Sequence, residues 1–548
     1  MITSYLHHSP KGRARRGLSL LSILLFAIAV QAQDTYTNER LVNNSSDVIG
    51  TARYVGMGGA LGALGADISV ISWNPAGIGL YRKNDIALTF GGIWGKTAIE
   101  NESRGKGTFD QIGFVYNMPL DEESCPYINF SFNYQKKINF NHNFQAVNNN
   151  LGGLSQMDQL AELTYWDDDW QNNLAGLALT YDSERVKKGE DRIFFKEDSN
   201  GDLYNDYSSG SNVYKHHSEG ALHSFDFNVS TNINNRAFLG LTVGVDNMRY
   251  FGWSYYRENF LGSNDPNYDL STDYRITGTG VNVKLGTIIR PIESNPFRFA
   301  FVVETPTWYR LRNLTLFDFS NSLENAMESK LRFNIRSPWK VRAGIGSTIG
   351  SSFAWDVDYE YAGHAGTSMG FPKNEYLDGT TSGNIKDVAM NDQTRNNLRG
   401  THTLRVGLEA NATKNLSFRL GYNLSTSAYN KNISFDQYQI NYEDIKEHGF
   451  AETAIDYSSS TSYMRMGNTN IMTLGIGYHI NKFYIDLAYK IRNQKADFYA
   501  FDTSFTNSEN GDPVFLRNAP ADLIDKTIDP VEVDLTRHAI TCTLGFKF

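Results

Sequence analysis

The sequence predicts an all-β protein, a 14-stranded antiparallel transmembrane β-barrel with an N-terminal plug of short helices in its lumen. Three observations predict this fold. Apolar and polar residues alternate along most of the chain, short and long connections alternate strictly from the fourth candidate strand onward, and a glycine-rich segment without alternation precedes the first strand. Alternation with a period of two is typical of strands that face lipid on one side and a polar lumen on the other.

The composition favours spanning strands over spanning helices. Only 41% of the 548 residues are hydrophobic, and beyond the N-terminus no segment reaches the roughly 18 apolar residues that a spanning helix needs. The chain contains 31 Tyr, 33 Phe and 47 Gly. Tyrosine and phenylalanine at this density suit the aromatic girdles of a membrane barrel.

The first 32 residues are predicted to be a secretory signal peptide. Residues 18–30 form a short apolar core, and Val30-Gln31-Ala32 resembles a cleavage site. The basic side chains before this core are Lys11, Arg13, Arg15 and Arg16. The alternative is an uncleaved anchor helix. Cleavage would remove four positive charges and take the net charge from −9 to −13, and an acidic chain without basic runs argues against nucleic-acid binding.

Residues 33–84 are predicted to form the plug. They do not alternate, and they carry glycine at positions 56, 58, 59, 62 and 65. A dinucleotide-binding loop is rejected, because the GxGxxG spacing is absent and no strand precedes the run. Small residues at this density permit close backbone packing in a confined space, which suits a segment enclosed by a barrel.

Residues 85–548 are predicted to form the barrel. In Asn415–Leu424, for example, five apolar side chains share one face and four polar or glycine positions share the other. The fourteen candidate strands lie near 85–98, 108–118, 127–141, 219–234, 236–252, 273–291, 296–308, 328–348, 351–363, 397–412, 415–429, 465–481, 482–499 and 536–548.

The connections between these strands differ in length in a regular way. Short turns are expected near 234–236, 291–296, 348–351, 412–415 and 480–482, and long polar loops near 142–218, 252–272, 309–327, 364–396, 430–464 and 500–535. Outer-membrane barrels have short periplasmic turns and long external loops. Residues 154–181 have partly helical spacing, which predicts short helices over the external mouth.

The last candidate strand, 536–548, alternates and ends in Phe548. A terminal phenylalanine resembles the signal that the bacterial outer-membrane assembly machinery reads, so this machinery is an expected partner. An ordinary edge strand that ends in Phe is the alternative. We therefore expect a multi-pass protein of the bacterial outer membrane, in contact with outer-membrane lipid.

The segment "ARYVGMGGALGALGADISVISWNPAGI" resembles the start of the mature FadL/OmpP1/TodX family of hydrophobic-compound channels. Its specific part covers about thirty residues. The family's Gly-rich hatch and Asn-Pro-Ala triad match Gly56, Gly58, Gly59, Asn74, Pro75 and Ala76. The resemblance implies a fourteen-stranded barrel, a hatch that the triad holds in the lumen, and ligand exit sideways through a kinked early strand. The triad also suits a helix start, because Asn caps helices and Pro favours the first turn.

Inward positions of the predicted strands carry many charges. Basic side chains there could bind the carboxylate of a ligand through charge-assisted hydrogen bonds. The candidates are Arg298, Lys340, Arg342, Arg405 and Arg419. The alternative, which we favour, is a network of ion pairs with Glu304, Glu409 and Asp486 that stabilises the barrel.

No catalytic constellation is evident, so we expect neither an enzyme nor a bound cofactor. The histidines lack metal-ligand spacing, although haem binding at His216-His217 stays open. An acidic loop around Asp198 could bind calcium, but it lacks the glycine and glutamate of a hand-type loop. Cys125 and Cys542 are expected to be free thiols.

Together these features predict an outer-membrane channel for passive, hatch-gated uptake of hydrophobic small molecules, such as long-chain fatty acids or aromatic compounds. The alternative is a non-transporting barrel component of protein secretion or surface attachment that binds a protein partner through its loops. An apolar lumen that ends at a gap near the third strand would favour transport.

Overall fold

The computed structural model describes residues 41–42, 47–95, 105–156, 196–197, 203–204, 209–261, 268–292, 294–319, 326–372, 384–386, 388–430, 462–501 and 528–548. The predicted signal peptide (1–32), nearly all of the predicted mouth helices (154–181) and the acidic loop around Asp198 lie outside these residues. Within the described part, no helix is both long enough and apolar enough to cross a membrane.

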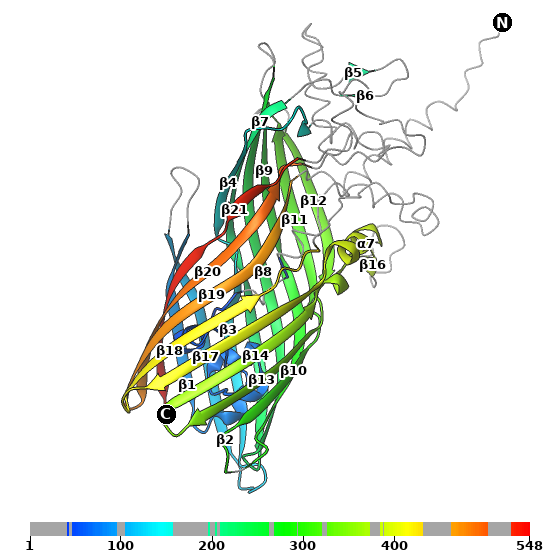
Figure 1. Ribbon diagram of the computed structural model, residues 1–548. Helices are drawn as coiled ribbons and strands as arrows, with labels where there is room; N and C mark the ends of the chain where they lie inside the picture. Colours follow the sequence, from blue (N-terminus) through cyan, green and yellow to red (C-terminus); the bar gives the residue numbers. More distant parts are fainter. Residues whose placement is uncertain are drawn as a thin grey trace, which may run out of the picture.

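The described strands form one closed antiparallel barrel (Figure 1). The ring closes because the first strand pairs along its whole length with the last, from Asp85 opposite Lys547 to Gly95 opposite Arg537. The fourteen staves are β1 (Asp85–Gly95), β2 (Gly105–Pro119), β3 with β4 (Tyr127–Asn139 and His142–Asn148), β7 (Ser209–Ile233), β8 (Ala237–Phe260), β9 (Tyr268–Ile289), β10 with β11 (Arg298–Glu304 and Trp308–Phe319), β12 with β13 (Ala326–Arg336 and Lys340–Ile349), β14 with β15 (Phe353–Gly363 and Ser368–Pro372), β16 with β17 (Asn384–Lys386 and Gly400–Asn411), β18 (Leu416–Ser425), β19 (Tyr463–Ile480), β20 (Phe483–Tyr499) and β21 with β22 (Val531–Asp534 and Arg537–Lys547). The predicted fourteen-stranded barrel is confirmed.

The remaining elements are short. A separate hairpin pairs β5 (Lys196–Glu197) with β6 (Leu203–Tyr204). Three helical turns precede the barrel, α3 (Ala52–Gly56), η1 (Ile68–Ser72) and η2 (Pro75–Leu80). Two more, η5 (His364–Gly366) and α7 (Val388–Asn397), lie between β14 and β17.

Several predicted loops are in fact strand. The loop expected at 252–272 is largely the ends of β8 and β9, and most of the loop expected at 309–327 belongs to β11 and β12. The loop expected at 142–218 contains β4 and the start of β7, and that at 364–396 contains β15, β16 and α7. These stretches looked polar because they continue above the apolar belt, where the outward face carries charges.

The outward face forms an apolar belt. Exposed apolar side chains recur at every second position, as in Leu239, Leu241 and Val243 of β8. Three diagonal cross-strand hydrogen bonds join a tyrosine hydroxyl to a histidine Nδ1 on this face, at distances of 2.7 to 2.8 Å: Tyr134–His223, Tyr359–His402 and Tyr489–His538. Such an apolar band bordered by aromatic rings suits the membrane and its interfaces.

The short turns all lie at one end of the barrel. Asn234 and Asn235, between β7 and β8, both have positive φ, which is the geometry that a two-residue hairpin turn requires. The backbone at Asn84, just before β1, bonds to Phe548 at the same end. We call this the short-turn end and the opposite one the long-loop end.

Candidate functional site

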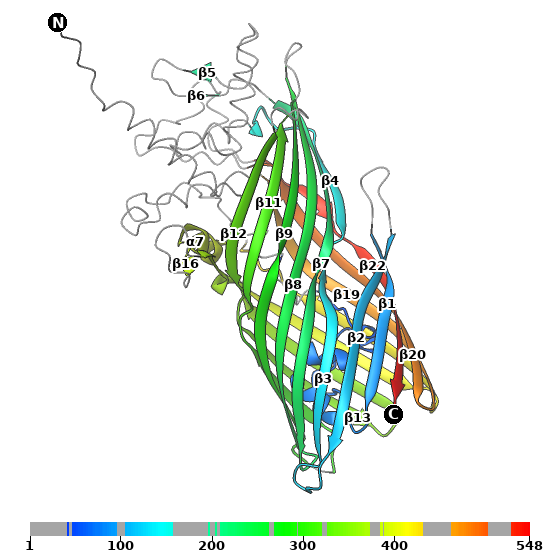
Figure 2. The ribbon, with the colours of Figure 1, turned by 180° about the vertical axis from the view of Figure 1, so that it is seen from behind.

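Residues 47–81, which we call the N-terminal segment, lie inside the barrel in the half nearer the short-turn end (Figure 2). Nearly all of their side chains are buried. Most of their apolar side chains belong to one cluster that includes Tyr54, Leu61, Ile68 and Trp73, and Ala63 and Ala76 belong to a second one. The segment therefore fills the lower lumen as a packed body rather than as a loose strap.

Carboxylates of β14 hold this segment by its backbone. Asp356 accepts hydrogen bonds from the N–H groups of Ala63 and Leu64 at 3.0 and 2.7 Å. Asp358 accepts from the N–H of Gly62 at 2.8 Å and from the indole N–H of Trp73 at 3.0 Å. Two carboxylates thus satisfy four donors that are otherwise enclosed within the barrel.

The Asn-Pro-Ala triad is the start of η2. Asn74 caps it, because its Oδ1 accepts from the N–H of Ala76 at 3.1 Å, and Pro75 occupies the first turn. The Asn74 amide also donates to the carbonyl of Gly62 at 2.7 Å. A side chain at Gly240 of β8 would collide with the backbone of Pro75. The triad therefore touches the wall, although its role in holding a hatch stays a prediction.

Glycines of the N-terminal segment lie against glycines of the barrel wall, so the two backbones approach each other closely. Gly58 and Gly59 have φ of +65° and +79°, where residues with side chains are rare. A Cβ on Gly421 of β18 would lie 2.0 Å from the Gly58 nitrogen, so no side chain fits at this contact. Gly56 approaches Gly475 of β19 in the same way.

Four of the five predicted carboxylate-binding residues lie beside the N-terminal segment, and Lys340 lies on the wall. Arg342 pairs with Glu304 and Glu360, each at 2.5 Å, and Arg419 pairs with Glu409 at 2.7 Å and Asp486 at 2.6 Å. The other three contact the segment or the wall. Arg298 donates to the carbonyl of Leu64, Arg405 donates to the Tyr54 hydroxyl, and Lys340 lies opposite Glu304 in the register.

This is the ion-pair network that the sequence analysis favoured. It extends into the N-terminal segment, because Arg53 binds Glu409 at 2.9 Å. Arg342 and Arg405 also lie over the ring of Trp73, with their guanidinium carbons 4.3 and 3.5 Å from its centroid. Whether any of the five also contacts a ligand stays a prediction.

Above the segment, the inward face of one wall is apolar. The buried side chains that form this upper apolar cluster come from β3, β7, β8, β9, β11, β12, β15, α7 and residues 41–42. They are Leu41, Val42, Ile138, Phe140, Leu222, Met248, Tyr250, Ile276, Tyr309, Leu311, Phe333, Ile335, Met369 and Met390. The sequence analysis named none of these residues as part of a site.

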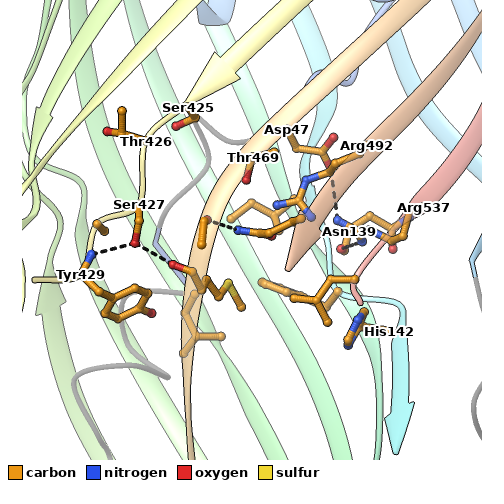
Figure 3. Close-up of a pocket in the computed structure, with 18 of the residues that line it drawn as sticks. Asp47, Asn139, His142, Ser425, Thr426, Ser427, Tyr429, Thr469, Arg492 and Arg537 are labelled. Atoms are coloured by element: carbon orange, nitrogen blue, oxygen red, sulfur yellow. Dashed lines mark hydrogen bonds and ion pairs between the residues drawn. The ribbon is translucent and has the colours of Figure 1, made fainter. Parts of the chain in front are cut away.

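A cavity of about 90 Å³ borders this cluster (Figure 3). Its apolar side includes Leu41, Ile138, Phe140 and Tyr250, all members of the cluster. Its polar side comes from the ends of β18, β19, β20 and β22. A cavity of about 150 Å³ holds a benzene ring. The present space therefore takes the end of an alkyl chain, and a larger ligand requires its lining to move.

The polar side of the cavity is rich in cations. Asp47 pairs with Lys490 at 2.7 Å and lies 3.9 Å from Arg537, and Arg492 lines the same space. Burial acts to raise the pKa of Asp47, but the charges of Lys490, Arg537 and Arg492 outweigh it and hold that pKa well below its usual range. Three cations therefore face one carboxylate here.

The barrel wall is not continuously paired beside this cavity. Backbone pairing of β2 with β3 runs from Pro119 opposite Tyr127 to Gln111 opposite Gln135 and stops there. Beyond that point β2 pairs with β1 alone, and β3 pairs with β7 across an irregularity at residues 136–138. We call this unpaired stretch the open seam, and in both views the β1–β2 hairpin stands away from β4 at this level (Figures 1 and 2).

Side chains bridge the open seam. Lys136 of β3 lies 3.5 Å from Asp110 of β2 and donates to the Thr108 hydroxyl. Lys106 of β2 reaches Glu219 of β7 at 2.9 Å. Arg537 of β22 donates to the carbonyl of Asn139, so the end of β3 leans toward the lumen. The apolar cluster thus reaches a wall position that only side chains close.

Among the described residues, no group of three or more His, Cys, Asp or Glu side chains is placed to hold a metal ion. Cys125 and Cys542 are both free thiols.

A closed fourteen-stranded barrel with a buried N-terminal segment places the chain among transmembrane β-barrels. Among solved structures it is similar to a FadL homologue of Pseudomonas aeruginosa, with 11% identity over 91% of this chain and 98% of that one and a TM-score of 0.50. The resemblance to the FadL/OmpP1/TodX family is confirmed at the level of the fold.

Two further matches cover 91% of this chain. They are the toluene transporter TbuX of Ralstonia pickettii (12% identity, 99% of that chain, TM-score 0.44) and the monoaromatic hydrocarbon channel CymD (11%, 98%, 0.45). No family model matches the sequence, and no curated protein matches it.

Proposed function

We propose that this protein is an outer-membrane channel of the FadL/OmpP1/TodX type that takes up hydrophobic small molecules passively. The observation that carries the proposal is that the upper apolar cluster, above a buried N-terminal segment, ends at the open seam. Ile138 and Phe140 belong to the cluster and lie where β3 loses its pairing with β2. An apolar interior that ends at a gap near the third strand is the arrangement that favours transport.

Entry would be driven by removal of apolar surface from water. At about 25 cal/mol per Å², burying roughly 200 Å² of a ligand contributes about 5 kcal/mol. The cations beside Asp47 would bind the carboxylate of a fatty acid. A neutral aromatic compound would bind through the apolar side of the cavity alone. Fatty acids and aromatic hydrocarbons therefore both stay within the proposed ligand class.

Exit through the open seam is favoured over exit through the short-turn end. Expelling the N-terminal segment would break several buried ion pairs, and separating one such pair costs about 3–5 kcal/mol. Among the described residues, no backbone hydrogen bonds join β2 to β3 across the open seam. We therefore place the gate at the open seam.

Closing the seam by cross-linking tests this route. In a background with Cys125→Ser and Cys542→Ser, the pair Asp110→Cys and Lys136→Cys would be bridged with a short thiol-specific linker. Uptake of a fluorescent fatty acid and of a neutral aromatic compound would be followed in cells that lack other hydrophobic-compound channels. We expect uptake to fall at least tenfold on bridging and to recover when the linker is cleaved.

The matched control bridges Asn411→Cys with Ser417→Cys, which lie opposite each other in the fully paired β17–β18 seam, away from the cavity at the short-turn end. This bridge closes no gap, so uptake should stay unchanged. Equal uptake before and after bridging at 110 and 136 would contradict the lateral route. Absent uptake by the unbridged protein, together with stable capture of a secreted protein, would favour the protein-partner role of the long loops instead.

A further inference from the structure

Six arginines lie on the outer face of four neighbouring strands toward the long-loop end. They are Arg249 of β8, Arg275 of β9, Arg310 and Arg312 of β11, and Arg332 and Arg336 of β12. All six are exposed and point away from the lumen. We call them the arginine patch. It has no part in the transport route, because that route lies inside the barrel and at the β2–β3 seam.

The register of the sheet brings these side chains together. Arg249 lies opposite Thr277, Thr277 lies opposite Arg312, and Arg312 lies opposite Arg332. Neighbouring strands are about 4.8 Å apart, so these three arginines cross the wall as a row about 15 Å long. Arg275 and Arg310 are one outward position above and below the row, and Arg336 is two positions below it.

The patch carries charge that the described part of the protein does not neutralise. None of the six guanidinium groups has an ion pair with a described residue. Arg312 directly opposite Arg332 is an unfavourable arrangement, since like charges at opposed positions destabilise a sheet. Asp273 and Asp318 lie farther toward the long-loop end than Arg275, and Glu219 of β7, at the level of Arg275, pairs with Lys106 instead. A site of this kind is complete only when an anion binds to it.

The position of the patch indicates which anion. On β8, ten residues separate Leu239, in the apolar belt, from Arg249. At about 3.3 Å per residue and a strand tilt of about 40°, ten residues rise about 25 Å, the height of the apolar band of a membrane barrel. Below the row, the same strands present Val243, Leu285 and Trp308 to lipid. The patch therefore sits where the headgroups of one leaflet meet the belt.

We propose that the arginine patch binds the phosphate headgroup of an anionic lipid in the leaflet at the long-loop end, with the acyl chains lying along β8, β9, β10 and β11. The guanidinium fork matches phosphate oxygens in pairs, and a row of arginines can hold two phosphates at once. The apolar belt beneath the row contacts the acyl chains. One lipid molecule therefore fits both the arginines, through its phosphate, and the apolar belt, through its acyl chains. A free anion or a soluble acidic partner would use the arginines alone.

Native mass spectrometry of the full chain in neutral detergent tests this assignment. The probes are a bisphosphorylated lipid A, phosphatidylglycerol and zwitterionic phosphatidylcholine. We expect the strongest binding for lipid A and the weakest for phosphatidylcholine. The variant Arg249→Gln/Arg312→Gln/Arg332→Gln should raise the Kd for lipid A at least tenfold. If this variant does not fold, Arg312→Gln alone should raise the Kd several-fold.

The matched control removes three exposed lysines at the short-turn end, Lys83→Gln/Lys414→Gln/Lys482→Gln, and should leave the Kd within twofold of the wild type. Equal lipid A binding by the wild type and the patch variant would overturn the proposal. Complete displacement of lipid A from the wild type by millimolar inorganic phosphate would also overturn it, because it would show a site for free anions rather than for a lipid.

Discussion

The indole of Trp73 joins the N-terminal segment to three strands, β13, β14 and β17. Its N–H donates to Asp358 of β14, and the guanidinium groups of Arg342 and Arg405 lie over its ring. Cation–π contacts in desolvated sites contribute about 2 kcal/mol or more. This one side chain therefore links a carboxylate and two cations that would otherwise lie in the lumen without a common partner.

We expect Trp73→Ala to loosen the N-terminal segment while the barrel stays closed. Removing a buried tryptophan costs about 3–5 kcal/mol, which corresponds to exchange faster by roughly a hundredfold or more where local opening controls it. Hydrogen exchange of peptides from residues 50–81 measures this effect. Trp339→Ala, at an exposed position just before β13, is the control and should leave these peptides unchanged. Equal protection in both variants would show that Trp73 is not an anchor.

For individual residues, the sequence predicted which side chains face the lumen better than it predicted which groups those side chains contact. Alternation placed Arg342, Arg405 and Arg419 on the inward face, and they are buried there. It named Glu304, Glu409 and Asp486 as their partners, but it could not show which pairs form or that Glu360 and Trp73 join them, because those contacts cross strands or join the wall to the N-terminal segment. Asp356 and Asp358 were missed for the same reason, since their partners are backbone N–H groups that no side-chain pattern reveals.

At the scale of the strand, the alternation changes phase along β8, β11 and β12. Near the short-turn end of β8 the outward positions are apolar and Thr242 points inward. Farther along the strand Arg249 points outward, while Met248 and Tyr250 point into the upper apolar cluster. The same inversion occurs in β11, where Arg310 and Arg312 flank the inward Leu311.

This inversion explains both what the sequence predicted and what it missed. Lower strand segments follow the usual membrane pattern and were recognised. Upper segments have a charged outer face, and for this reason the sequence pattern predicts loops near 252–272 and 309–327, where strands continue. A search for the phase change, rather than for one fixed pattern, would have located the end of the belt and the apolar part of the lumen together.

The ion pair between Lys136 and Asp110 is expected to hold the open seam nearly closed. Lys136→Gln removes the charge, and Asp110 keeps its 2.5 Å hydrogen bond from Thr108. Uptake of a fluorescent fatty acid should rise several-fold, because no backbone bond resists separation of β2 from β3 here. Asp110→Asn should act in the same direction. Lys495→Gln, which breaks the exposed pair with Glu532, should leave uptake unchanged. Unchanged or slower uptake in both seam variants would argue against a latch.

At the scale of the molecule, the lumen has two unlike sides. Charged side chains that contact the N-terminal segment come mainly from β13, β14, β17 and β20, whereas the upper apolar cluster comes mainly from β3 to β12. The charged contacts thus lie around the N-terminal segment, and the apolar wall lies beside the open seam. Fold, strand number and loop order followed from the sequence, but this division depends on contacts between distant strands.

Deleting residues 47–80 should convert the closed barrel into an open pore. The strands bond to one another rather than to the segment, and β1 begins only at Asp85, so the barrel should still form. Its inner wall would then expose Asp356, Asp358 and Arg405 to water, and hydrated charges of both signs line the channels of general porins. In planar bilayers we expect discrete ion-conducting steps that the full chain lacks, with folding checked by heat-dependent gel migration. A folded deletion variant that conducts no better than the full chain would show that the lumen is closed elsewhere, by the long loops rather than by the N-terminal segment.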